Sequence, residues 1–142
     1  MSSPRRHLAD RGSVTLELAV LAPALLLLLA ALVLAGRVQT TASAVEHAAR
    51  AAARDASLAR TANAVRHAAM ATADAALVGS RCTTADVTLE TAGFSAPVGT
   101  SATVTATVTC SVTFADLAVP GLPGSHTITA RATSPIDRYR AR

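Results

Sequence analysis

Hydrophobic residues follow three different patterns along this chain. Residues 18–35 are all Leu, Ala or Val except for the single Pro23. At 1.5 Å per residue a helix over this run spans about 27 Å, close to the roughly 30 Å of a bilayer's hydrocarbon core. The run therefore predicts a transmembrane helix, bounded at residues 13–36. Proline removes one backbone hydrogen bond, so we expect a kink or local melting of the helix at Pro23.

The second pattern covers residues 37–78, which contain no Gly and no Pro and are rich in Ala. Such a composition favours helix. Small apolar residues recur mostly at intervals of three, four or seven and define one stripe. The stripe consists of Val38, Ala42, Val45, Ala49, Ala52, Ala56, Ala59, Val65, Ala69, Ala73 and Leu77. Because Gly79 is a natural stop, we expect one Ala-rich helix over 37–79 that continues the membrane helix.

The third pattern has a period of two and begins after Ser80. Even-numbered apolar residues from Val104 to Phe114 alternate with Thr or Ser from 103 to 113. Shorter alternations surround Val87 and Leu89 and cover 127–133, with turn residues at 92–99 and 120–124. The expected fold class is α+β, a long N-terminal helix packed on a three-stranded antiparallel meander formed by residues 80–142.

Two cysteines, Cys82 and Cys110, both follow the apolar run. In an outward-facing domain they predict one disulfide, which would close a loop of about 29 residues and contribute roughly 3–4 kcal/mol. In a cytosolic domain they would stay reduced. In an antiparallel pair, Val87 and Leu89 would lie opposite even-numbered residues of the strand that contains Cys110. The same register would place Cys82 opposite an odd-numbered residue, and therefore not opposite Cys110. Cys82 then lies in the loop before the first strand or a bulge shifts the register; we expect the loop.

The segment before the apolar run carries an unusual charge. Arg5, Arg6 and Arg11 form a basic leader, and Glu17 follows at the edge of the run. A charge costs roughly 2.5–3.5 kcal/mol near the centre of a membrane helix and less toward the interface, so an acid here indicates a function. An uncleaved anchor and a secretory signal cut before Gly36 are the ordinary alternatives, and neither needs Glu17.

Gly12, followed by Ser13, Glu17 and a leucine-rich helix containing Pro23, resembles the cleavage and assembly signature of type IV pilin-like proteins. The resemblance covers residues 5–37 and is strongest to the TadE-like pseudopilins of tight-adherence pilus systems. It implies a pilin-like fold and cleavage after Gly12 by a prepilin peptidase, which removes a leader of residues 1–12. It also implies a single-pass inner-membrane protein with a cytoplasmic amino terminus and an extracytoplasmic carboxy-terminal domain. Its partners would be other pilin subunits and the pilus assembly platform.

The resemblance gives Glu17 a physical role. Cleavage would free the amine of Ser13, which is a cationic partner for a carboxylate in apolar surroundings. Ser13 and Glu17 are four residues apart and share one face of a helix. The amine could equally belong to a neighbouring subunit, so both pairings stay open.

The remaining composition argues against other classes of function. The net charge is +4 from 13 Arg and no Lys, but only Phe94, Phe114 and Tyr139 are aromatic, which disfavours nucleic-acid binding. His47 and His67 would lie about 30 Å apart on a straight helix and could not share a metal ion. We therefore expect no cofactor, no metal site and no enzyme activity. The alternative to an assembly subunit is an uncleaved, membrane-anchored binding module.

Overall fold

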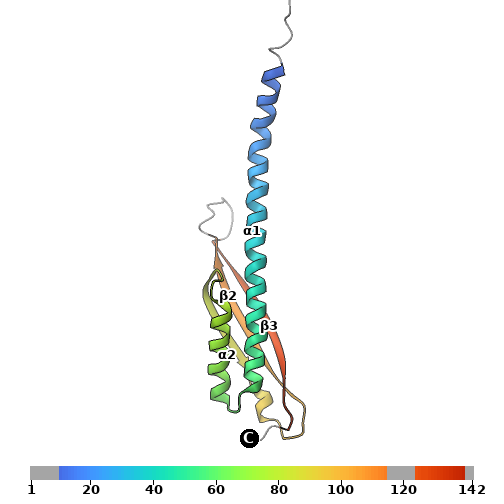
Figure 1. Cartoon of the computed structure of the whole chain (residues 1–142), viewed down its shortest axis with the longest axis vertical. Coiled ribbons are helices and arrows are strands. Elements are labelled where there is room, and N and C mark those ends of the chain that lie inside the picture. The colour runs from blue at the N-terminus through green and yellow to red at the C-terminus, as the bar shows by residue number, and fades with distance from the viewer. Residues whose placement is uncertain (1–9, 115–123, 140–142) are drawn as a thin grey trace, which may run out of the picture. The chain divides into compact units, whose positions relative to one another are not determined.

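The computed structural model describes residues 10–114 and 124–139 and has an α+β fold, as expected (Figure 1). The chain divides into two compact units, Met1–Val38 and Gln39–Arg142. We call the second unit the head domain. The elements follow one another as α1 (Asp10–Leu58), α2 (Ala62–Leu77), β1 (Cys82–Glu90), the short 3₁₀ helix η1 (Ala92–Ser95), β2 (Ala102–Thr113) and β3 (Ser125–Ile136).

The first unit contributes the amino-terminal part of α1. Pro23 lies inside this helix, and the helix runs through it without interruption. Local melting at Pro23 is therefore not observed, whereas a kink there stays a prediction. A proline in a helix still leaves one backbone carbonyl without its usual donor.

The expectation of one helix over 37–79 was wrong, because α1 ends at Leu58 and α2 begins at Ala62. Thr61 is the N-cap of α2: its backbone is extended, and its side chain accepts a hydrogen bond from the Ala64 N–H at 3.3 Å. The Thr72 hydroxyl of α2 donates to the Asp55 carboxylate of α1, so the two helices lie side by side. Helix propensity is a weak prior, and here the packing of a separate, shorter α2 beside α1 outweighs it.

The predicted apolar stripe forms the buried face of this helical pair. The buried positions are Val45, Ala48, Ala49, Ala52, Ala53 and Ala56 from α1 and Val65, Ala69, Ala73 and Leu77 from α2. Ala42 and Ala59, at the margins of the stripe, are only half-buried. Most of these residues are alanines, whose small side chains allow close approach of the packed elements.

The three strands form the predicted antiparallel meander, in the order β1-β2-β3. The even-numbered apolar residues of β2 from Val104 to Val112 are buried, while hydroxyl side chains line the other face. There the hydroxyls of Thr105 and Thr133 lie 3.1 Å apart and form a cross-strand hydrogen bond. Val87 pairs with Val108, so odd positions of β1 oppose even positions of β2, as expected.

The connections between these elements are partly as predicted. Gly79 ends α2 with a positive φ of 79°, a conformation that favours glycine, and the Ser80 N–H closes the turn on the Leu77 carbonyl at 2.9 Å. The segment predicted as a turn at 92–99 contains η1. Of the other predicted turn, 120–124, only Gly124 is among the described residues.

Overpacking of the alanine face tests this arrangement. Ala69 is fully buried in α2, and Ala71, two residues on, is exposed. We expect Ala69→Leu to destabilise the head domain by about 1–3 kcal/mol, because the packed face cannot admit the larger side chain. Ala71→Leu should change stability by no more than about 0.5 kcal/mol. Urea unfolding of the full chain in detergent, followed by circular dichroism, measures both. Equal effects at the two positions would contradict the packed face.

Candidate functional site

All three residues of the predicted cleavage and assembly signature lie in α1. Gly12, Ser13 and Glu17 belong to one uninterrupted helix, and the side chain of Glu17 is exposed. The side chains of Gly12 and Ser13 lie outside what the structure describes. On a helix, residues 13 and 17 share a face and differ by about 6 Å along the axis. The helix therefore places an amine created at Ser13 within reach of the Glu17 carboxylate.

The apolar part of α1 is not covered by the rest of the chain. The leucines between residues 18 and 32 are 55–68% exposed. Among the described residues, the stretch Glu17–Leu58 is the one candidate membrane span, and none of its most apolar window, with a mean hydropathy of 2.9, is buried. This surface is long and apolar enough to cross a membrane. In water it would need another cover, such as a neighbouring helix.

A disulfide joins two strands of the head domain. Cys82 is the first residue of β1, Cys110 is buried in β2, and their Cα atoms are 5.4 Å apart. The expectation that Cys82 lies in the loop before this strand was therefore wrong, and a bulge solves the register conflict instead. Cys82 pairs with Val112, but Thr84 already pairs with Ser111, so one extra residue stands in β1. With that extra residue, even-numbered Cys82 pairs with even-numbered Val112, and its side chain turns toward the buried face of the sheet.

The inserted residue, Thr83, is held at the bulge by a side-chain contact. Its hydroxyl donates a hydrogen bond to the Ser111 carbonyl oxygen at 2.8 Å. In the register that simple alternation predicts, Cys82 does not lie opposite Cys110, and this conflict was the sequence signal for the bulge. Alternation alone could not distinguish a bulge from a longer loop, because both bring the cysteines together.

Two ion pairs lie on the surface of the head domain. Arg50 contacts Glu46 at 2.7 Å, and Arg131 contacts Glu90 at 2.5 Å. Exposed pairs of this kind contribute at most about 1 kcal/mol each. They are features of a solvated surface.

The two helix histidines lie on different helices, so the distance expected on one straight helix does not apply to them. His47 is in α1 and His67 is in α2, and both are exposed. Within residues 10–114 and 124–139, no group of three or more His, Cys, Asp or Glu side chains could hold a metal ion.

Comparison with known proteins agrees with the amino-terminal signature. The model of the TadE-like protein family matches residues 12–54, which confirms the resemblance found in the sequence. The match begins at Gly12, includes Glu17 and the apolar run, and ends within α1. No curated protein and no solved structure matches the chain. The similarity to TadE-like proteins covers the amino-terminal part of the chain, which includes the one helix of the described residues that is long and apolar enough to span a membrane.

Reduction of the disulfide tests how the head domain is held together. We expect the Cys82→Ala/Cys110→Ala variant to lose roughly 3–4 kcal/mol of stability, since the loop closed by the bond is about 29 residues long. Hydrogen exchange should accelerate most in β1, an edge strand that the bond ties at its bulged end. The matched control is the wild-type chain with and without reductant. Unchanged exchange in β1 after reduction would show that strand pairing alone holds it.

Proposed function

We propose that this chain is a minor pilin or pseudopilin that is cut after Gly12 and then used to build or prime a pilus or secretion filament. The observation that carries the proposal is the family match over residues 12–54, which includes the cleavage glycine, the acid and the apolar run. In α1 these three features follow one another on a single helix. The proposed partners are a prepilin peptidase, other pilin subunits and the pilus assembly platform.

Gly12 suits a cleavage position inside a helix. Glycine costs about 1 kcal/mol relative to alanine in a helix interior and has no side chain. The backbone around Gly12 can therefore unwind into an extended strand for a peptidase more easily than its neighbours can. The cut releases the basic leader and leaves Ser13 with a free, positively charged amine.

Glu17 is proposed as the acid that holds this amine during assembly. In hydrocarbon an isolated carboxylate is strongly disfavoured, and a cation beside it offsets part of that cost. Within one chain the pair would be separated by four residues. Between chains, the same attraction would fix how far one helix is displaced along its neighbour, and so would set the axial register of the filament.

In this proposal, the exposed apolar surface of α1 contacts two environments one after the other. It first contacts lipid, with the amino terminus in the cytoplasm and the head domain on the other side of the inner membrane. It then packs against the same surface of other subunits. The disulfide supports the outward placement, because such bonds persist in oxidising compartments.

The mature amino terminus tests the cleavage. We expect protein recovered from membranes to begin at Ser13, and Gly12→Ala to leave the leader uncut, because a methyl group at this position obstructs the peptidase. Amino-terminal sequencing reads both results. A terminus at Gly36 would indicate a signal peptidase. An intact leader on the wild-type chain would instead favour the uncleaved, membrane-anchored binding module.

Substitution of Glu17 tests the assembly role. We expect Glu17→Ala to be processed normally but to enter filaments at least about tenfold less well, corresponding to the loss of one charge-assisted contact. Glu17→Asp, which keeps the charge, should recover part of the incorporation. Glu46→Ala is the matched control, since Glu46 is an exposed acid of the head domain. Immunoblots of sheared filaments measure incorporation, and normal levels for Glu17→Ala would contradict the role.

A further inference from the structure

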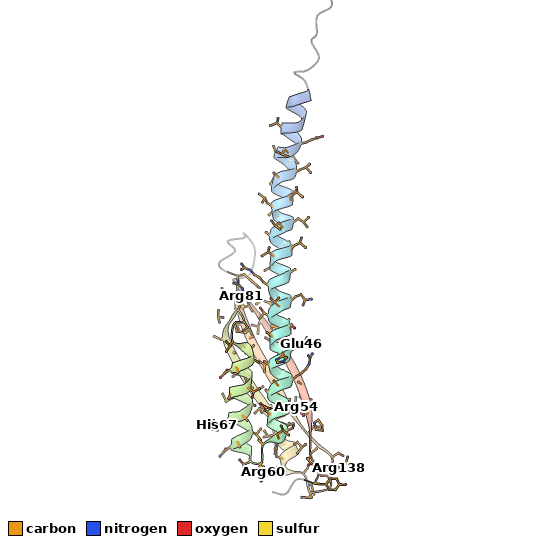
Figure 2. All side chains as sticks on the ribbon, in the orientation of Figure 1. Glu46, Arg54, Arg60, His67, Arg81 and Arg138 are labelled. Carbon is orange, nitrogen blue, oxygen red and sulfur yellow. A yellow bond between two sulfur atoms is a disulfide. The ribbon has the colours of Figure 1, made fainter. Side chains whose placement is uncertain are left out.

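The two cysteines of the disulfide differ in how deeply the head domain buries them. Cys110 is fully buried in the central strand β2, which pairs with a strand on each side. Cys82 is half-buried and is the first residue of the edge strand β1. Arg81, which directly precedes it, lies at the end of the head domain opposite Arg60 and Arg138 (Figure 2). The head domain thus protects Cys110 more than Cys82.

The end of β1 that carries Cys82 has few contacts besides the disulfide. In β1, Val87 and Leu89 are half-buried like Cys82, and the other six residues are exposed. The bulge interrupts the pairing with β2 directly after Cys82, where the Thr83 hydroxyl donates to the Ser111 carbonyl oxygen at 2.8 Å. A protein opens locally where few apolar contacts and an interrupted ladder hold the chain. Without the disulfide, this end of β1 therefore opens at a lower free energy than the core does.

Exposure of Cys110 requires a larger opening. Its neighbours on the same face of β2, Val108 and Val112, are also buried. Cys110 itself pairs with Ala85 on one side and with Ile128 on the other. To reach its sulfur, a reagent has to part β2 from the helices that cover this face of the sheet, and such an opening approaches unfolding of the whole head domain. We therefore expect Cys82 to react with an external disulfide faster than Cys110 does.

We propose that Cys82 is the site at which a protein thiol oxidant acts on this chain, and that Cys110 is the thiol that completes the reaction. The partner is a thiol–disulfide oxidoreductase whose own cysteine pair is in the disulfide form. The Cys82 thiolate attacks one sulfur of that disulfide, forms a mixed disulfide and displaces the other sulfur as a thiolate. Cys110 loses its proton, attacks the Cys82 sulfur and displaces the partner's remaining thiolate. In balance, two electrons and two protons pass from the head domain to the partner, whose disulfide becomes two thiols.

The order of these steps determines when β1 is fixed. The mixed disulfide forms while the bulged end of β1 is open, and the attack by Cys110 then ties that end to β2. β1 is therefore the last strand of the sheet to be held in place. The inference rests on the extracytoplasmic placement of the head domain in the proposed function, because disulfides form in oxidising compartments, but not on cleavage after Gly12 or on Glu17.

Single-cysteine variants of the full chain, reduced and held in detergent, test the order. Oxidised glutathione is the probe, and mass spectrometry follows the formation of the glutathione adduct. We expect Cys82 in the Cys110→Ala chain to react at least about tenfold faster than Cys110 in the Cys82→Ala chain. In urea that unfolds the head domain, the two rates should become equal. Equal rates without urea, or the same ratio of rates in urea, would overturn the proposal.

Two neighbouring threonines of β1 provide a matched pair of variants. Thr83 and Thr84 are both exposed, and the Thr83 hydroxyl makes the hydrogen bond that bridges the bulge. In the Cys110→Ala chain, Thr83→Ala should speed the reaction of Cys82 by about two- to tenfold, because the loss of this bond eases the opening. Thr84→Ala should have the smaller effect. A larger effect of Thr84→Ala would contradict the role of the bulged end.

Expression in cells tests the partner. Cys110→Ala should accumulate a mixed disulfide between Cys82 and a protein with a Cys-x-x-Cys pair, seen on non-reducing gels and identified by mass spectrometry. Cys82→Ala should accumulate little. Equal amounts from the two variants, or no adduct from either, would overturn this inference and leave the proposed function intact. Wild type recovered with both thiols reduced would instead contradict the extracytoplasmic placement, and with it the proposed function.

Discussion

The rest of the molecule depends on an apolar surface that the chain cannot bury by itself. Residues 18–35 of α1 present an almost unbroken apolar surface, and none of its most apolar window is buried. In water such a surface drives insertion or association, and about 25 cal/mol is at stake for each Å² removed from solvent. The structure therefore makes sense with a membrane or with neighbouring helices around α1. Glu17 directly precedes this surface, so its charge influences which partner is accepted.

The head domain has to bury its own core, and it does so with few large side chains. Its helices bury mainly alanine, which contributes less apolar area per residue than leucine or valine. Breaking the helix after Leu58 brings a second short helix beside the first, so that both cover the sheet. The hydrogen bonds between Thr72 and Asp55 and between Ser134 and Ser57 tie α1 to α2 and to β3. The disulfide then fixes β1, the strand whose inward-facing Val87 and Leu89 are only half-buried.

Much of this architecture followed from periodicity in the sequence. The three-to-four spacing of the apolar stripe and the alternation from Val104 to Phe114 each specify which side chains face inward. Two features did not follow. The break near Ala59 brings α2 back against α1, where Thr72 contacts Asp55, and helix propensity contains no information about such contacts between residues remote in sequence. The bulge at Thr83 depends on a covalent bond that overrides simple alternation, and the sequence left it as one of two solutions.

For the amino-terminal signature, the sequence is more informative than the folded structure. The spacing of Gly12, Ser13 and Glu17 points to cleavage after Gly12 and to an ion pair between the new amine and Glu17. That amine exists only after cleavage, so the contribution of the uncleaved chain's structure is that the three residues lie on one helix. The head domain contributes few anchors of its own. Aromatic anchors are scarce in it, because this chain has no Trp and a single Tyr, and its sheet presents mostly threonine hydroxyls; arginine is the one hot-spot residue type that it has in number. In the proposed filament, affinity between subunits would therefore come from the apolar surface of α1 and from Glu17 at its edge. The head domain would determine what the filament shows to its surroundings.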